Sequence, residues 1–313
     1  MSTSSEPLWS IGELAERAGA TVKTVRFYSD RGLLPETARS GGGHRRYGPA
    51  ALERLRLIRS LRGLGLSLPG IRRVLDDEDA AGPVLEGAVD SRLRELGDEL
   101  RTLRWRQAAL ELVRDCPPAR RAGRLNLLSA LSTPPSTAPL ARFWRGWLPP
   151  RMPARATAAF LEVAVPQPPD APRPAQVLAF ARLHAMTTAP CPEGRRPQPD
   201  VHRVAGARGA AVLYAGLTEA FALAGTHLRR AQAPHPGEAL DAYVAAYAGA
   251  YRSRDTPGFR RLLAGRLAAE PRLDQYWRLV AIVLSEPGGG VQPTPGSADE
   301  WLRTALRQEA GTA

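Results

Sequence analysis

Residues 10–31 read SIGELAERAGATVKTVRFYSDR, and this stretch decides how the first part of the chain folds. Ser10 and Glu13 have the spacing of a capping box, which predicts that a helix begins here and ends at Gly19. Thr21 is then placed to cap a second helix. Two short helices joined by a glycine-containing turn are typical of a helix-turn-helix, whose second helix can enter the major groove of DNA.

A basic hairpin is predicted directly after this motif, over residues 36–47. Ser40 and three glycines form its tip, and residues 44–47 form the returning strand. Glycine at the tip permits close approach of the backbone. The guanidinium groups of Arg45 and Arg46 and the hydroxyl of Tyr47 suit phosphate oxygens, which accept hydrogen bonds from all three. The pattern therefore predicts a basic wing beside the helix-turn-helix.

More helices follow the wing. Pro49 opens a third helix, and residues 68–70 begin a fourth. From about Pro83 to Arg114, apolar or neutral residues recur at intervals that alternate between three and four residues over about three heptads. This pattern predicts the seam of a coiled coil. The seam positions are Val89, Leu93, Leu96, Leu100, Leu103, Gln107 and Leu110.

Three parts of this sequence resemble the MerR family of bacterial transcription regulators: Ile11 to Ser40, the Arg-Arg-Tyr of the wing, and residues 59–68. The resemblance covers residues 8–76 closely and the following helix in position and length. It implies a mainly α fold with a winged helix-turn-helix DNA-binding domain at residues 1–80. It also implies a dimerisation coiled-coil helix at 81–115, which pairs antiparallel, and an all-helical effector-binding or regulatory domain at 116–313.

The resemblance further implies a homodimer that binds a pseudo-palindromic promoter and distorts its spacer so that RNA polymerase with its sigma factor can use it. It places DNA contacts on the recognition helix, the wing and the third helix, at Thr24, Arg26, Tyr28, Arg45, Arg46, Tyr47 and Arg62. We add Lys23 from its position on the recognition helix. Phe27 and Ser29 depart from the family, which usually has a tyrosine and an acidic residue there, so the operator sequence does not carry over.

Each of these assignments has a plainer alternative. Tyr28 could be a packing residue, and Arg62 could be a solvated surface charge. The apolar seam could pair within one chain instead of between two. We expect the seam residues Val89, Leu93, Leu96, Leu100, Leu103 and Leu110 to form the dimer interface, because their acidic neighbours suit a solvent face better than DNA.

Charge distinguishes the three regions. The 313 residues carry a net charge of +12, which favours polyanionic partners without choosing among them. Residues 1–75 have 13 basic and 6 acidic side chains, residues 76–115 have 6 basic and 11 acidic ones, and the remainder has 24 basic and 14 acidic ones.

The composition is that of a globular protein, and we expect the protein to be cytoplasmic. The most apolar stretch, Gly209 to Gly225, is shorter than the ~20 residues of a membrane span.

We predict neither a metal site nor a cofactor. Two cysteines, Cys116 and Cys191, lie 75 positions apart, whereas soft-metal sensing needs two or three neighbouring thiolates. The five histidines are dispersed. His227 and His235 are eight positions apart with a proline between them, so no helical pair of ligands is expected. No catalytic motif is present either, and we do not expect an enzyme.

Beyond residue 116, proline-rich joints alternate with segments that we predict to be helical. These are Ala154–Val165, Ala175–Thr188, Val201–Arg230, Glu238–Arg254, Phe259–Ala269, Leu273–Ser285 and Ala298–Gln308. Residues 116–161 contain seven arginines and no acidic residue. They could form a solvated linker or could supplement the binding of DNA or an acidic effector.

Aromatic residues are concentrated in this second half. They could line a pocket for a flat organic effector, or they could simply form a helical core. The six candidates for an effector pocket are Trp144, Trp147, Tyr243, Tyr247, Tyr251 and Trp277. A regulator without any ligand, whose helical domain binds protein partners, remains the alternative.

Overall fold

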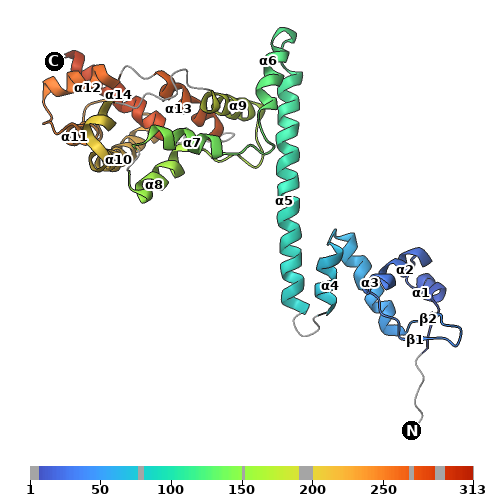
Figure 1. The fold of residues 1–313 in the computed structure, drawn as a ribbon. Coiled ribbons are helices and arrows are strands. Elements are labelled where there is room, and N and C mark those ends of the chain that lie inside the picture. The colour runs from blue at the N-terminus through green and yellow to red at the C-terminus, as the bar shows by residue number, and fades with distance from the viewer. Residues whose placement is uncertain are drawn as a thin grey trace. The chain divides into compact units, whose positions relative to one another are not determined.

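The computed structural model describes residues 7–76, 81–149, 152–189, 200–267, 271–285 and 293–312. The chain is mainly helical, as predicted, and divides into two compact units, Met1–Leu100 and Arg101–Ala313. The division falls inside one long helix, α5 (Ala81–Arg114), which contributes residues to both units (Figure 1). The segment predicted as a separate dimerisation region, residues 81–115, is thus part of each unit.

The first unit contains a helix-turn-helix, a short hairpin and a second pair of helices, followed by the first part of α5. Along the chain these elements are α1 (Ile11–Arg17), α2 (Val22–Asp30), β1 (Ala38–Arg39), β2 (Arg45–Arg46), α3 (Pro49–Gly63) and α4 (Leu68–Asp76).

Local hydrogen bonds explain where α1 and α2 begin and end. The Ser10 hydroxyl accepts from the Glu13 amide at 3.3 Å, and the Glu13 carboxylate accepts from the Ser10 amide at 2.7 Å, which confirms the capping box. Gly19 follows α1 with a φ of +57°, a left-handed conformation that favours glycine. The Thr21 hydroxyl accepts from the Thr24 amide at 3.1 Å and so caps α2.

A compact apolar core holds α2 in place. Leu14 of α1, Val25 of α2, Leu55 and Ile58 of α3 and Ile71 of α4 are completely buried in it. Each such side chain stabilises the fold by about 1.5–3 kcal/mol relative to exposure. One face of α2 is therefore fixed against its neighbours and the other is left to solvent.

The predicted wing is present. β1 and β2 pair antiparallel, with Ala38 opposite Arg46 and Arg39 opposite Arg45. A bridge between Trp9 and Tyr47, with N–O distances of 2.8 and 2.9 Å, joins the returning strand to the segment that leads into α1. The wing is thus attached to the helix-turn-helix at its base.

The second unit contains the remainder of α5 and a set of helices separated by proline-rich joints. They are α6 (Pro118–Ser129), α7 (Ala138–Trp147), α8 (Ala154–Ala164), α9 (Pro174–Thr188), α10 (Asp200–Arg229), α11 (Glu238–Tyr251), α12 (Pro257–Leu267), α13 (Pro271–Leu284) and α14 (Pro295–Thr312). Several of them begin with proline, which is favoured at the first helical position because its missing N–H would have no partner there.

Seven of these helices, α8 to α14, lie within a few residues of the predicted segments. Two others, α6 and α7, were not predicted. They occupy the arginine-rich stretch of residues 116–161, whose interpretation as a solvated linker is wrong, because Leu140, Trp144 and Trp147 of α7 are buried. Apolar residues spaced three and four apart among the arginines make this stretch amphipathic rather than unstructured.

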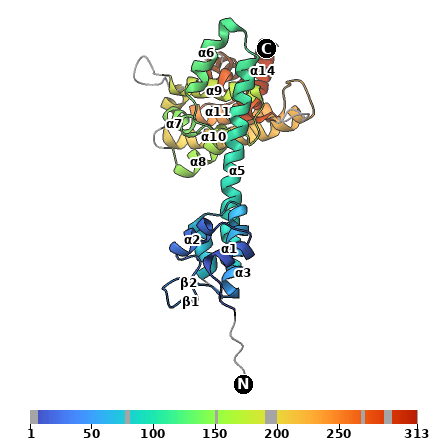
Figure 2. The same ribbon diagram turned by 90° about the vertical axis from the view of Figure 1, so that its right-hand side faces the viewer.

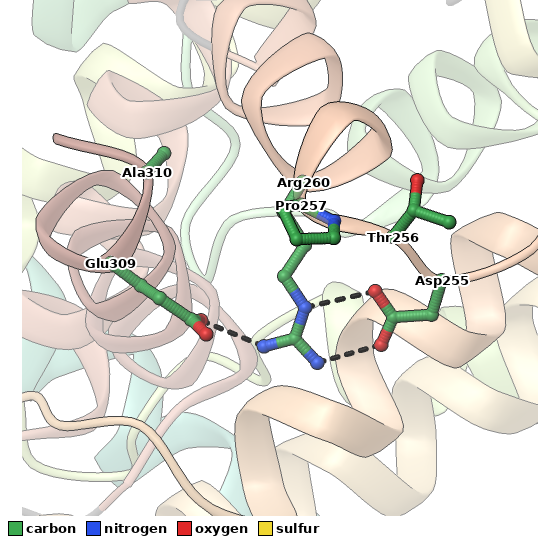
Figure 3. Close-up of a pocket in the computed structure, with 6 residues that line it drawn as sticks. All are labelled: Asp255, Thr256, Pro257, Arg260, Glu309 and Ala310. Atoms are coloured by element: carbon green, nitrogen blue, oxygen red, sulfur yellow. Dashed lines mark hydrogen bonds and ion pairs between the residues drawn. The ribbon is translucent and has the colours of Figure 1, made fainter. Parts of the chain in front are cut away.

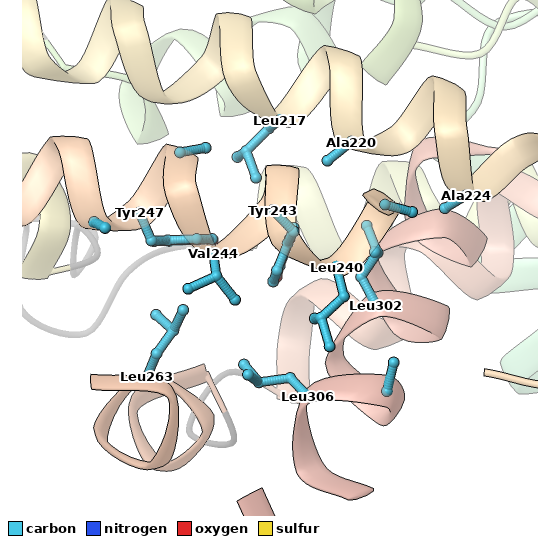
Figure 4. Packing of buried hydrophobic residues seen from close by; sticks show 14 of the residues in the cluster. Leu217, Ala220, Ala224, Leu240, Tyr243, Val244, Tyr247, Leu263, Leu302 and Leu306 are labelled. Atoms are coloured by element: carbon cyan, nitrogen blue, oxygen red, sulfur yellow. The ribbon is translucent and has the colours of Figure 1, made fainter. Parts of the chain in front are cut away.

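Two clusters of buried side chains hold the second unit together. In the first, α10 and α11 lie side by side (Figure 2) and pack on α12 and α14, which contribute Leu263, Leu302 and Leu306 (Figure 4). A Cβ on Gly216 would come within 2.7 Å of the Ala246 Cβ, so this helix pair requires glycine at its closest approach. The second cluster joins α5, α7, α9 and α13 around Trp105, Phe180 and Tyr276.

The apolar part of α10 is longer than the sequence predicts. The stretch Gly209–Arg229 has 21 residues and is long and apolar enough, by length and composition alone, to cross a membrane. The expectation that it is too short is therefore wrong. Core helices share this composition, and one face of the stretch packs into the cluster with α11 through Leu213, Leu217 and Ala220.

Candidate nucleic-acid interface

The exposed face of α2 carries three of the eight residues predicted to contact DNA, Lys23, Thr24 and Arg26. Lys23, Arg26 and Phe27 are exposed and Thr24 is half-buried. In the part of the chain that the structure describes, no ion pair or hydrogen bond engages the side chain of Lys23 or Arg26. Two cations on one helix face are thus available to base edges or phosphates.

Two of the predicted contact residues lie in the core instead. Tyr28 is 8% exposed and packs among the apolar side chains of the first unit, which agrees with the alternative that it is a packing residue. Tyr47 is completely buried, and its hydroxyl donates to the Ser29 hydroxyl at 2.9 Å. The prediction that the Tyr47 hydroxyl meets a phosphate does not fit this burial, since its donor is already bonded inside the protein.

The wing is held to α2 by a second contact. The Arg45 guanidinium binds the Asp30 carboxylate at 2.5 Å and the Glu36 carboxylate at 3.2 Å. The hydrogen bond to Asp30 raises the pKa of Arg45 further above its usual range. Glu36 also pairs with Arg39 at 2.6 Å. The charge of Arg45 is therefore largely compensated by Asp30 and Glu36, whereas Arg46 has no ion-pair partner among the described residues.

Sequence reasoning missed both partners on α2, Ser29 and Asp30. Each lies in the last turn of the helix and binds a residue of the returning strand, Tyr47 and Arg45 respectively. We call these two contacts the wing clasp. The only signal in the sequence was that Ser29 stands where the family usually has an acidic residue, with Asp30 directly after it.

Two arginines of α3 brace turns of the first unit. Arg62 donates to the Leu66 carbonyl across the turn between α3 and α4, yet its side chain is exposed. Arg59 donates to the Ala18 carbonyl beside the turn of the helix-turn-helix. Arg62 is thus a turn-bracing residue whose charge still faces solvent, which leaves its predicted phosphate contact sterically open.

Another exposed cation lies at the end of α2. The Arg31 guanidinium sits 4.3 Å from the centre of the Phe27 ring, a cation–π contact that orders both side chains. At the start of the unit, Arg17 sits 4.6 Å from the centre of the Trp9 ring in the same way. The basic surface of the first unit is therefore wider than the sequence analysis assigned.

The seam of α5 remains uncovered. Its leucines are exposed, with Leu93 at 60%, Leu100 at 50%, Leu103 at 58% and Leu110 at 71%. Leu96 is also exposed, at 36%, and Val89 is half-buried. The alternative that the seam pairs within one chain is therefore wrong for these leucines.

A different face of α5 packs into the protein. Trp105, Ala108 and Leu112 contact the second unit's core, and the Trp105 indole donates to the Pro169 carbonyl at 3.0 Å. With 3.6 residues per turn, these positions point away from Leu103 and Leu110. The helix therefore uses one face for the core and leaves its apolar seam free.

The six predicted effector residues fall into two separate clusters. Trp144, Trp147 and Trp277 belong to the cluster around α7, α9 and α13, with the Trp144 and Trp277 ring centres 5.7 Å apart. Tyr243, Tyr247 and Tyr251 belong to the cluster around α10 and α11. The structure does not gather them into one pocket, and the Trp144 and Tyr243 side chains are buried.

A buried polar group explains why α11 carries tyrosines. The Tyr243 hydroxyl donates to the Asp299 carboxylate at 2.8 Å, and Arg303 binds the same carboxylate at 2.9 Å. Burial raises the pKa of Asp299 above its usual range, and the Arg303 guanidinium opposes that shift. Tyr243 thus satisfies a polar group inside the core, which favours the core interpretation of the tyrosine stripe over a pocket.

Neither of two surface pockets among the described residues contains any of the six aromatic residues. One, of about 290 Å³, lies at the start of α12 (Figure 3). Arg260 crosses it to bind Asp255 at 2.6 Å and Glu309 at 2.7 Å, and it also binds Asp241 at 2.7 Å. Because three carboxylates surround this guanidinium, the pocket offers little to an anion. The other pocket, of about 710 Å³, lies between α4 and α5.

The candidate metal ligands lie as follows. Cys116 is a buried free thiol, and Cys191 lies outside the described residues. Within the described ranges, no group of three or more His, Cys, Asp or Glu side chains could hold a metal ion. His227 and His235, which the sequence separates, have ring centres 4.7 Å apart.

Comparisons with known proteins match the part of the chain that contains the helix-turn-helix and the wing. The family model described as MerR HTH family regulatory protein matches residues 9–78. The nodulation protein NolA of a Bradyrhizobium strain is 39% identical over 101 residues, which are 30% of this chain and 43% of NolA. The HTH-type transcriptional regulator ZntR of Escherichia coli is 34% identical over 130 residues, 40% of this chain and 92% of ZntR.

A solved structure is also similar, that of the transcription regulator PbrR691 from Ralstonia metallidurans in complex with lead(II). It has 35% sequence identity and a TM-score of 0.32, and the match covers 35% of this chain and 89% of that one. The chain spans less than half the length of NolA, and none of these matches covers more than two fifths of this chain.

Proposed function

The chain belongs to the MerR family of transcription regulators, and from this premise we propose that it binds a pseudo-palindromic promoter as a homodimer and distorts the spacer in response to an effector. The observation that carries the proposal is the exposed face of α2, where Lys23 and Arg26 have no partner among the described residues while the wing clasp fixes the wing beside them.

The residues divide into contact and positioning roles. Lys23, Thr24 and Arg26 face the major groove, and Arg26 has the bidentate donors that read guanine edges. Arg46 and Arg62 bind phosphates. Arg45, Tyr47 and Tyr28 act as positioning residues, because the first two form the wing clasp and the third packs α2 on its core.

The homodimer forms through the seam of α5. Five exposed leucines along one face of a 34-residue helix are costly in water and match the heptad spacing of a two-stranded coiled coil. Two chains joined in this way present two copies of α2 to the two halves of a pseudo-palindrome. RNA polymerase with its sigma factor is the further partner, and the protein acts in the cytoplasm, without enzymatic activity.

The first candidate role of the second unit is to bind a small organic effector. The alternative is a ligand-independent regulator whose second unit binds protein partners, and the tight packing of the six aromatic residues favours that alternative over a preformed pocket. Thermal unfolding against a panel of aromatic metabolites and drugs separates the two. A binder stabilises the folded state by linkage and raises the melting temperature, whereas a panel without effect favours the protein-partner role.

The role of Arg26 is tested on a selected operator. The full chain is used to select its binding sequence from random duplexes, and the affinity of the Arg26→Ala variant is then measured on that sequence and on unrelated DNA. We expect a loss of about 1–3 kcal/mol on the operator and a much smaller loss on unrelated DNA. Arg254→Ala, an exposed residue of the second unit, is the matched control. Equal losses on both duplexes would remove Arg26 from base recognition.

A further inference from the structure

Two histidines and a tryptophan meet where the loop between α10 and α11 passes α14. His227 lies in the last turn of α10, His235 lies in the loop, and Trp301 lies on α14. The His227 ring stacks on the Trp301 ring at 5.2 Å, with 9° between the planes, and the His235 ring meets both edge-on at 4.7 and 5.3 Å. The two imidazoles are therefore direct neighbours.

Hydrogen bonds favour one tautomer of each neutral ring. The Nδ1 atom of His235 lies 2.8 Å from the Pro236 carbonyl oxygen, and the Nδ1 atom of His227 lies 2.6 Å from the Gln232 side-chain oxygen. Because these oxygens only accept, Nδ1 carries the hydrogen in each ring, and Nε2 of the neutral imidazole keeps a lone pair. Among the described residues no protein group bonds to either Nε2 atom.

The loop that carries these groups is itself fixed. The Trp301 indole donates to the backbone carbonyl of Gln232 at 3.0 Å, and the backbone amide of Gln232 donates to the backbone carbonyl of His227 at 3.0 Å. Ala231 adopts a left-handed conformation with a φ of +51°, which turns the chain directly after α10. His235 is exposed and His227 is half-buried, so solvent reaches the pair.

We propose that His227 and His235 bind one divalent transition-metal ion through their Nε2 atoms, with water completing the coordination. Each ring has the hydrogen bond typical of a metal-ligating histidine, in which Nδ1 donates to a carbonyl oxygen and Nε2 is left to bind the ion. Imidazole suits Zn²⁺, Ni²⁺ and Cu²⁺. The site is independent of the proposed binding of DNA, and an ion there would tie the loop after α10 to the last turn of that helix.

Zinc binding by the tag-free full chain tests this site. Calorimetric titration with Zn²⁺ is compared for the wild type, H227Q, H235Q and the double variant, with H44Q as the control, since His44 lies exposed on the wing. We expect the wild type and H44Q to bind one more ion per chain than the double variant. Zinc bound by thiols persists in all of these proteins, so the difference isolates the histidine pair. Equal stoichiometry and affinity in the double variant would overturn the proposal.

A second variant and a second readout keep the result independent of misfolding. Gln232→Ala leaves both ligands in place but removes the oxygen that orients His227, and we expect about 10- to 100-fold weaker binding. In ¹⁵N spectra of the histidine rings, we expect Nε2 to be unprotonated in His227 and His235, with Zn²⁺ shifting these two signals selectively. Unshifted Nε2 signals at saturating Zn²⁺ would overturn the proposal as well.

Discussion

Two adjacent arginines of the wing have different surroundings, and this difference predicts different roles in binding DNA. Arg45 is bound by Asp30 and Glu36, whereas Arg46 has no ion-pair partner among the described residues. A cation that is already compensated displaces fewer counterions from DNA than a free one. The charge pattern alone, in which both residues are simply basic, does not separate them.

We therefore expect Arg46→Ala and Arg45→Ala to act differently on the salt dependence of DNA affinity. Arg46→Ala removes a phosphate contact and lowers the slope of log affinity against log salt by about one. Arg45→Ala leaves the slope close to that of the wild type, because it releases Asp30 and Glu36 rather than a phosphate. Titrations of each variant at several salt concentrations measure this, and equal slopes for the two variants would contradict the distinct roles.

The buried imidazole of His202 predicts how stability depends on pH. Its Nε2 atom lies 2.8 Å from the Tyr214 hydroxyl, and its Nδ1 atom is buried without a hydrogen-bond partner. Burial lowers the pKa of His202 to about 4, and a contact with the backbone of Trp147 partly opposes the shift. The folded state therefore holds this ring neutral, whereas the unfolded chain protonates it near pH 6.5.

Because the folded pKa is the lower one, the contribution of His202 is fully present above about pH 6.5 and is lost as the pH falls through about 4. The loss amounts to up to about 3 kcal/mol in the free energy of unfolding. Urea unfolding of the wild type and of His202→Gln, measured from pH 7.5 to 4, checks this. We expect a flatter pH profile for the variant, and parallel profiles would show that His202 is not held neutral.

Elements whose ends are set by neighbouring residues could be predicted well from the sequence. Both ends of α1 and the start of α2 follow from Ser10, Glu13, Gly19 and Thr21, which lie at or next to these helix ends. The wing clasp could not be predicted in this way, because Asp30 and Arg45 are 15 positions apart and meet only once the wing folds back.

Longer-range packing also explains the errors in the second unit. The apolar face of α7 was not recognised in the sequence, because arginines such as Arg145 lie between its apolar residues. The burial of Trp144 and Trp147 in the structure shows this face. The tyrosines of α11 do share one face, but that face meets Asp299 of α14, which no local pattern connects to them. His227 and His235 became neighbours through the turn at Ala231.

The seam of α5 leads to a prediction about dimerisation. Leu100 lies near the middle of the seam, so in an antiparallel pair it faces the same residue of the second chain. Leu100→Glu would remove two leucines from the interface, at about 1.5–3 kcal/mol each, and would place two carboxylates opposite one another. We expect the dissociation constant of the dimer to rise at least about 100-fold, as measured by sedimentation equilibrium.

Leu262→Glu is the control for this change, since Leu262 is an equally exposed leucine on α12, away from the seam. We expect it to leave the association unchanged. A Leu100→Glu protein that dimerises as tightly as the wild type would place the dimer interface elsewhere.

For the whole molecule, the distribution of charge says more than its total. The net charge of +12 is shared between a basic first region, an acidic long helix and a basic remainder, and the DNA-binding residues that we propose all lie in the first unit. Arginines of the second unit are partly used in structure, as Arg260 and Arg303 each bind carboxylates of neighbouring helices. Their charge therefore does not by itself indicate a second surface for DNA.

Promoter recognition by a homodimer requires two copies of α2 to read the two halves of one operator. Hydroxyl-radical footprinting of the full chain on its selected operator tests this directly, with Arg26→Ala beside it. We predict two protected blocks on the duplex, related by a dyad, both weakened together in the variant. A single protected block, or protection that Arg26→Ala leaves unchanged, would contradict the account.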